Sequence, residues 1–173
     1  MNYTVGDRVV YPMHGAGVIS SIEKKEVMGD IKEYYFLDLP YGNTFLMIPV
    51  DNADSVGVRT IIDKEEVSKV LDHIKNTTIE CNQNWNKRHR ENLERLRTGN
   101  IYDVADVYKA LLCREKDRAL STGEKKMLSN TRNILYSELS LSSGKDEEEI
   151  NDLINNILEF DEWGNIIPMN ILE

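Results

Sequence analysis

A basic stretch that begins at residue 84 combines the side chains best suited to contact a nucleic acid. It reads Asn84-Trp85-Asn86-Lys87-Arg88-His89-Arg90. On a helix, Lys87 and Arg90 are i, i+3 neighbours with Arg88 between them around the axis, so their charges could converge on phosphates. Trp85 heads the same helix, where its ring could wedge against a base step in a minor groove. Spacing alone nevertheless favours a simpler interpretation, in which Trp85 packs in the core with later leucines and the cations form a solvated face.

A second basic pair, Lys125-Lys126, follows the capping box Ser121-Thr122-Gly123-Glu124. The box predicts the start of a helix, where free amide donors and the helix dipole add to an anion site. Taken alone, the pair is best explained as ordinary surface charge. It gains functional meaning only if the fold brings it next to Lys87 and Arg90.

The residues able to support catalysis or metal binding form no recognisable motif. His14, His73 and His89 are scattered, and none has a partner at the spacing of a catalytic triad or a metal site. Cys81 and Cys113 belong to no CxxC pair and no zinc pattern, which predicts reduced thiols. We therefore expect no enzymatic activity, no cofactor and no metal.

The net charge of -9 conceals a basic middle. Residues 81–144 carry 12 basic and 8 acidic side chains, whereas residues 1–80 carry 8 and 13, and residues 145–173 carry 1 and 9. Because the screening length at physiological salt is about 8 Å, a local basic face can meet phosphates despite the acidic ends. We expect weak non-specific DNA affinity and a second anchor on a protein.

The composition is that of a soluble globular chain, with 40% hydrophobic and 29% charged residues. No stretch approaches the roughly 18 apolar residues of a membrane span. The first residues lack the basic and apolar regions of a secretory signal. We predict a cytoplasmic protein that does not contact a membrane.

Residues 1–57 show the pattern of short β-strands separated by glycine turns. A spacing of about ten residues predicts a small barrel of SH3 or Tudor type. Its aromatic residues are best explained as barrel core, and a cage for a methylated ammonium is the alternative. They are Tyr11, Tyr34, Tyr35, Phe36 and Tyr41.

Past residue 58 the apolar period changes from two to about 3.6, which predicts an all-helical part. Helices are expected after Asp63, over residues 84–98, from about residue 100, after Ser121 and after Gly144. The fold class is therefore α+β, with an N-terminal small β-barrel followed by about five helices. The expected domains are residues 1–58 and residues 59–160, followed by an extension of unknown role, residues 161–173.

Several segments between about residues 3 and 158 occur in the order known from one protein family. They are Val5-Gly6-Asp7-Arg8-Val9-Val10-Tyr11-Pro12-Met13-His14-Gly15-Ala16-Gly17, Lys32-Glu33-Tyr34, Asn52-Ala53, Val56-Gly57-Val58-Arg59, Asn84-Trp85, Asn92-Leu93-Glu94 and Leu120-Ser121-Thr122-Gly123-Glu124-Lys125-Lys126-Met127-Leu128. In these segments the chain resembles the CarD/CdnL bacterial transcription regulators. The resemblance implies that a Tudor-like domain docks on the β subunit of RNA polymerase. It also implies that the helical part contacts promoter DNA at the upstream edge of the melted bubble and stabilises the open complex.

The resemblance also assigns residues to both partners. It implies that a tryptophan at the position of Trp85 wedges into the minor groove, while basic side chains contact phosphates without reading sequence. The expected DNA-binding residues are Trp85, Lys87, Arg88, Arg90, Lys125 and Lys126, and the expected polymerase-binding residues are Lys25, Val27, Met47, Ile48 and Pro49. Met47 departs from the family, in which an arginine is common, so apolar strand pairing should carry more of the docking.

The expected function is that of a transcription regulator in the cytoplasm, associated with the nucleoid. Two alternatives remain open. In the first, the chain is a protein–protein adaptor whose basic helix is merely solvated. In the second, it is a Tudor-type reader of methylated lysine.

Overall fold

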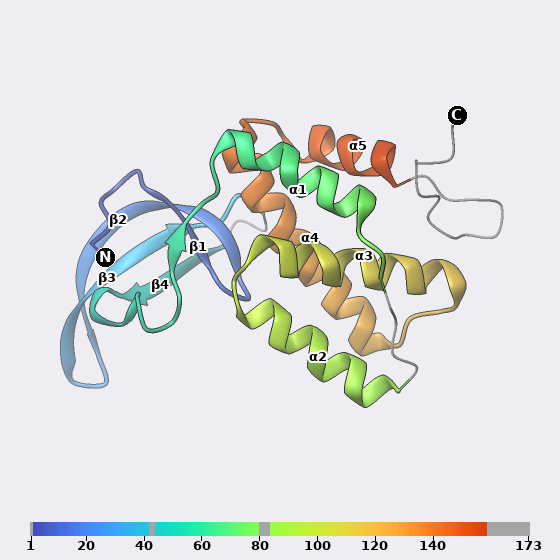
Figure 1. Ribbon diagram of the computed structural model, residues 1–173. Coiled ribbons are helices and arrows are strands. Elements are labelled where there is room, and N and C mark those ends of the chain that lie inside the picture. Colours follow the sequence, from blue (N-terminus) through green and yellow to red (C-terminus); the bar gives the residue numbers. More distant parts are fainter. Residues whose placement is uncertain (1, 42–43, 80–83, 159–173) are drawn as a thin grey trace.

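The computed structural model describes residues 2–41, 44–79 and 84–158. Within these residues, an antiparallel sheet lies at one side of the molecule and five helices lie at the other (Figure 1). This arrangement confirms the predicted α+β class. It also separates the chain into a β part and a helical part that lie side by side.

The described residues form a sheet of five strands, with one hydrophobic cluster that includes Val9, Ile19 and Leu37. The strands are β1 (Arg8–Tyr11), β2 (Gly15–Val27), β3 (Asp30–Asp38), β4 (Phe45–Pro49) and β5 (Arg59–Thr60), with a short 3-10 helix η1 (Val50–Asn52) after β4. Their order is β4-β3-β2-β1-β5. Among the described residues, the first and last strands of that order do not pair, so the sheet is open rather than the closed barrel that we predicted. Strand β5 extends the sheet to Thr60, two residues beyond the expected boundary.

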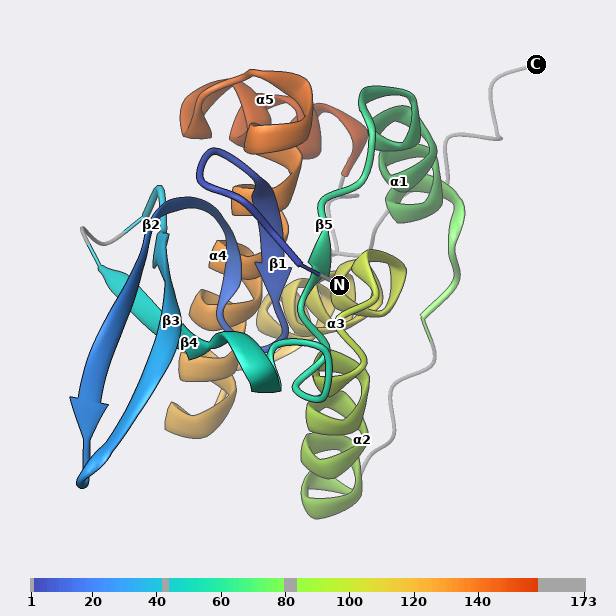
Figure 2. The same ribbon diagram turned by 90° about the vertical axis from the view of Figure 1, so that its left-hand side faces the viewer.

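The β2–β3 hairpin is the longest feature of the sheet. Its turn is centred on Met28 and Gly29, which have positive φ angles of 54° and 88°. Two such residues match the tight turns that join twisted antiparallel strands. The hairpin extends away from the helices (Figure 2) and leaves Met28 and Ile31 fully exposed or nearly so. Its outer half therefore contributes little to the core.

The helices are α1 (Lys64–Asn76), α2 (Trp85–Arg97), α3 (Ile101–Asp117), α4 (Thr122–Ser143) and α5 (Glu147–Ile157). Each begins after a residue whose side chain accepts a backbone N–H of the first turn. Ser121 and Asp146 do so within complete capping boxes. Buried residues of α1, α3, α4 and α5, with Leu96 of α2, form one core. None of the described helices is long and apolar enough to cross a membrane.

Close contacts join the sheet to α4. The Ala16 amide donates to Ser137 Oγ at 2.9 Å. Gly15 has φ 108°, and a Cβ atom there would lie 2.8 Å from the same oxygen. Only glycine has both the conformational freedom and the size for this approach. The first strands are thus held against the centre of α4.

Arg59 of β5 connects the sheet to two helices through all of its donor groups. It holds Glu138 of α4 with two bonds of 2.6 and 2.8 Å, and it donates to the Gly99 carbonyl at the end of α2 at 2.6 and 2.9 Å. Glu138 is 1% exposed and also accepts from the Ile62 amide at 3.0 Å. The α2 helix is therefore fixed in orientation relative to the sheet.

Candidate nucleic-acid and polymerase interfaces

Trp85 lies on the surface at the start of α2, with 43% of the residue exposed. Its Nε1 donates to Ser121 Oγ at 3.2 Å, and its ring stacks on His89. Leu96, about three turns further along nearly the same face of the helix, is buried. The interpretation that spacing alone favoured, in which Trp85 belongs to a core stripe, is therefore wrong. The leucine of that stripe packs inside, whereas the tryptophan packs against the start of α4.

The bond between Trp85 and Ser121 places the first turns of α2 and α4 next to each other. Asn84 begins α2 by accepting the Lys87 amide at 3.1 Å. Lys87, Arg90 and both lysines of the Lys125-Lys126 pair are exposed. Lys87 lies 3.8 Å from Glu91, a loose surface pair that leaves its charge accessible. The hydrogen bond between Trp85 and Ser121 thus brings together the starts of the two helices that carry these cations.

Arg88, expected to contact DNA, instead points into the protein. It is 5% exposed and binds Glu124 Oε1 through Nε at 3.0 Å and Nη2 at 2.6 Å. Arg114 of α3 lies 3.1 Å from the same oxygen, and Ser121 donates to the other one. Leaving a guanidinium charge buried without a partner is costly, and the carboxylate of Glu124 supplies that partner. Arg88 fixes α2 against α3 and α4, and we remove it from the expected DNA contacts.

Glu124 thus joins three helices. Burial by itself raises the pKa of its carboxyl group, but hydrogen bonds from Arg88 and Ser121 outweigh this effect, so the pKa lies below its ordinary value. Glu124 therefore remains ionised at neutral pH. Sequence reasoning found it only as a capping residue, because its partner Arg88 is 36 residues away.

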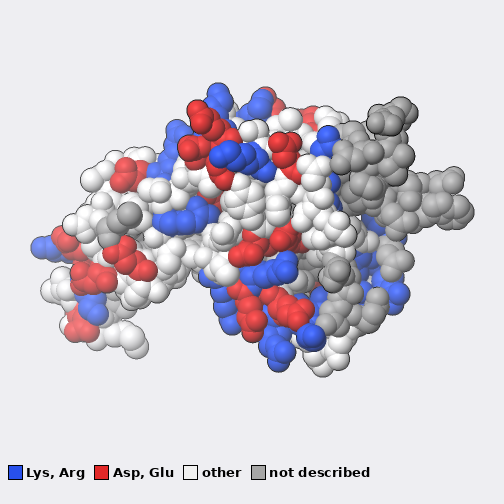
Figure 3. All heavy atoms as spheres, viewed as in Figure 1, with Lys and Arg blue, Asp and Glu red and all other residues white. Residues whose placement is uncertain are grey.

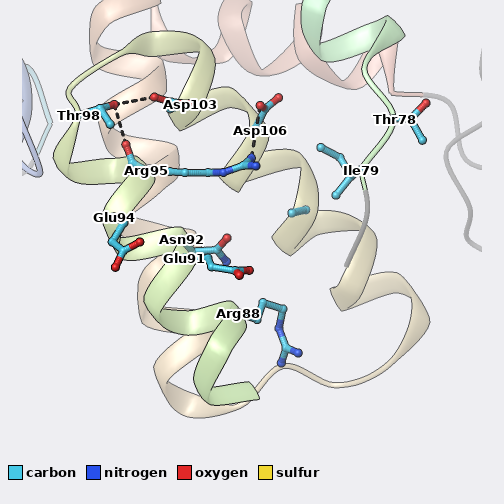
Figure 4. A pocket seen from close by; sticks show the side chains of 11 residues that line it. Thr78, Ile79, Arg88, Glu91, Asn92, Glu94, Arg95, Thr98, Asp103 and Asp106 are labelled. Atoms are coloured by element: carbon cyan, nitrogen blue, oxygen red, sulfur yellow. Dashed lines mark hydrogen bonds and ion pairs between the residues drawn. The ribbon is translucent and has the colours of Figure 1, made fainter. Parts of the chain in front are cut away.

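A polar cavity of about 610 Å³ lies between α2 and α3 (Figure 4). Two arginines and four acidic residues line it, so its charge does not favour a phosphate backbone. Asp106 in its wall contacts His73 Nε2 at 2.7 Å and Arg95 at 3.5 Å. On the face of the molecule shown in Figure 3, basic and acidic side chains mix over α2. On this face, the described residues of α2 therefore form no uniformly basic surface.

The second candidate interface is the outward face of the sheet at strand β4. Phe36 lies opposite Met47 in the register, and its ring stacks on Phe45 with centroids 6.1 Å apart. Lys25 Nζ lies 5.6 Å from the centre of the Phe36 ring. Phe45 and Met47 are 61% and 45% exposed. We name Lys25, Phe36, Phe45 and Met47 the docking face.

Of the five expected polymerase contacts, the structure brings two to the docking face. Val27 is 40% exposed but lies towards the tip of the hairpin, and Pro49 is half-buried at the end of β4. Ile48 is 2% exposed and belongs to the sheet core, because alternate residues of a strand point to opposite faces. We therefore correct its expected role to packing.

Two other expectations concern the same sheet and the end of the chain. Tyr34 and Tyr35 are 8% and 2% exposed, so they belong to the core, as we predicted, and cannot line an open cage. No cluster of three or more metal-ligating side chains occurs in the described part of the chain. Cys81 and the extension 161–173 lie outside the described residues.

Comparisons with known proteins match both parts of the chain. Residues 3–62 match the family described as the CarD-like/TRCF RID domain, and residues 69–155 match the CarD C-terminal domain. A Bacillus subtilis (strain 168) protein, the candidate transcription factor YdeB, is 33% identical over 148 residues, which cover 86% of this chain and 97% of that protein. The solution structure of the N-terminal domain of Myxococcus xanthus CarD matches with 34% identity over 34% of this chain and 79% of that chain, at a TM-score of 0.31.

These matches define a class of transcription factor, in which a domain of the RNA-polymerase-interacting type is followed by a helical domain. The chain belongs to the CarD family. The family resemblance of the sequence is thereby confirmed.

Proposed function

We propose that this protein is a non-enzymatic regulator that stabilises the open promoter complex. Its docking face binds the β subunit of RNA polymerase, and the paired starts of α2 and α4 contact promoter DNA at the upstream edge of the bubble. Trp85 wedges into the minor groove, while Lys87, Arg90, Lys125 and Lys126 contact phosphates without reading sequence. The domain boundaries are those expected from the sequence, with β5 added to the polymerase-binding domain.

One observation carries this proposal: a tryptophan with 43% of its surface exposed is held between two helix starts that each carry exposed cations. An indole has a large flat face and one N–H donor, so a partly exposed tryptophan suits a partner surface with aromatic faces or grooves. The adjacent cations specify the charge of that surface. DNA supplies both.

Docking on the polymerase compensates for the weak DNA affinity of an acidic chain. A tethered DNA-binding part experiences an effective DNA concentration of about a millimolar. Contacts too weak to hold DNA in solution then become useful. Stacking by Trp85 contributes about 1 to 3 kcal/mol, or about ten- to a hundredfold in the population of the open complex.

The lifetime of the open complex tests the proposal. We expect Trp85→Ala to shorten the lifetime about tenfold or more, while binding to the polymerase β subunit is unchanged. Trp163→Ala, which removes the other tryptophan of the chain, serves as the matched control. An unchanged lifetime with Trp85→Ala, at full polymerase occupancy, would contradict the DNA contact and favour the adaptor alternative.

A further inference from the structure

The imidazole of His89 lies against the indole of Trp85. The ring centroids are 5.0 Å apart, and the planes differ by 16°. The two residues are one turn apart on α2, at the i, i+4 spacing that brings helix side chains into contact. One face of the indole is therefore covered by a ring of the same helix.

Two further contacts lie along one edge of the same indole. Ser121 Oγ accepts the Nε1 proton at 3.2 Å. A Cβ atom on Gly123 would lie 3.8 Å from Cζ2, so the first turn of α4 passes along that side of the ring. The indole is thus held by one face and one edge, and part of the residue remains open to solvent.

The position of His89 is not explained by hydrogen bonding. Its Nδ1 is buried and makes no hydrogen bond with any described residue. Such a nitrogen is rare in folded proteins, because it gives up its bond to water without a replacement. Among the described residues, the His89 ring instead stacks on Trp85.

We propose that His89 is a positioning residue that holds the Trp85 indole ready to stack on a nucleobase. This inference rests on the proposed DNA contact and adds a residue to it. A ring that is already fixed loses little side-chain freedom when it binds. Without His89, the indole can rotate away, and binding must immobilise it again. The expected penalty is about three- to tenfold in affinity or lifetime, the usual cost of ordering one side chain.

Two variants of the full-length chain separate the stacked ring from the histidine itself. His89→Ala removes the ring, and His89→Phe restores a flat ring without the nitrogens. Both are made in a Trp163→Phe background, in which Trp85 is the only tryptophan. Glu94→Ala, an exposed change on the same helix, is the matched control. Thermal unfolding establishes that each variant is folded.

The first measurement is the quenching of Trp85 fluorescence by acrylamide, which reports the accessibility of the indole in the free protein. The second is the lifetime of the open complex with polymerase. His89→Ala should increase quenching and shorten the lifetime about three- to tenfold, whereas His89→Phe and Glu94→Ala should change neither. In a Trp85→Ala background, adding His89→Ala should have no further effect on the lifetime.

Unchanged quenching in His89→Ala overturns the inference, as does an equal loss of lifetime in the Trp85→Ala background. A wild-type chain that does not extend the lifetime at all would contradict the proposed function instead. In that case quenching alone decides whether His89 positions the indole.

Discussion

The contact between Arg59 and Glu138 allows a direct test of how the sheet and the helices are joined. The substitution Glu138→Gln keeps the size of the side chain but removes its charge. One amide oxygen can still accept a hydrogen bond, whereas the new amide group would face the Arg59 nitrogen that now lies 2.8 Å from Oε2. The substitution thus replaces an attraction by a contact between two donors.

The expected loss of stability follows from burial. Breaking a buried ion pair on one side costs about 3 to 5 kcal/mol, because the remaining charge is left without a partner. The Arg59 side chain is 31% exposed, so water recovers part of this cost, and we expect about 2 to 3 kcal/mol. With a urea dependence of about 2 kcal/mol per molar, the midpoint of unfolding should fall by about 1 M.

Urea unfolding followed by circular dichroism measures this shift. The control is Glu147→Gln, which breaks the exposed pair between Glu147 and Arg132, 2.8 Å apart, and should cost less than about 1 kcal/mol. A midpoint for Glu138→Gln that moves no further than the control would refute the reasoning. It would mean that the sheet and α4 are held by packing rather than by this ion pair.

Three further predictions use matched pairs of variants or conditions. The pKa of Glu124 in the folded protein lies below its ordinary value of 4.5, so the ionised carboxylate stabilises the fold above pH 4.5 and this stabilisation is lost as the pH falls through the folded-state pKa. The urea midpoint of the wild-type chain should therefore fall below about pH 4.5, and in Glu124→Gln it should fall less steeply over the same pH range. Lys25→Glu should weaken binding of the full chain to the polymerase β subunit about tenfold, measured by calorimetry; Lys24→Glu, on the opposite face of β2, should change it little, and equal losses would contradict the docking face. Gly15→Ala should cost about 2 kcal/mol or more in thermal unfolding; Gly6→Ala, which has a similar positive φ but no atom within 4 Å of its added Cβ, should cost less.

Local signals predicted the elements of this fold well. Asn84, Ser121 and Asp63 each accept an amide of the helix that follows, as their positions before apolar periodic segments indicated. Gly99 and Gly144 follow α2 and α4 with positive φ angles. Helix caps and C-terminal glycines depend only on residues that are close in the chain, so the ends of these helices can be predicted from the sequence alone.

The site was harder to predict because its decisive contacts join distant residues. The i, i+3 spacing places Lys87 and Arg90 correctly on the surface, but it cannot tell that Arg88 finds Glu124 across 36 residues. The same limit made Trp85 resemble a core residue, since Ser121 is also 36 residues away. Ile48 was misassigned for a different reason: an alternating strand has two faces, and the register that selects the buried one comes from pairing with β3.

Strand β4 has consequences for the behaviour of the protein when it is unbound. It is the terminal strand of the sheet order, and it exposes Phe45 and Met47 beside backbone groups on its outer side. A strand edge of this kind is a template for pairing with a second copy of the chain. Its five residues and the missing donor of Pro49 keep such pairing short. The protein should therefore become less soluble when its concentration exceeds that of the partner that covers this edge. Binding of that partner would keep the protein in solution.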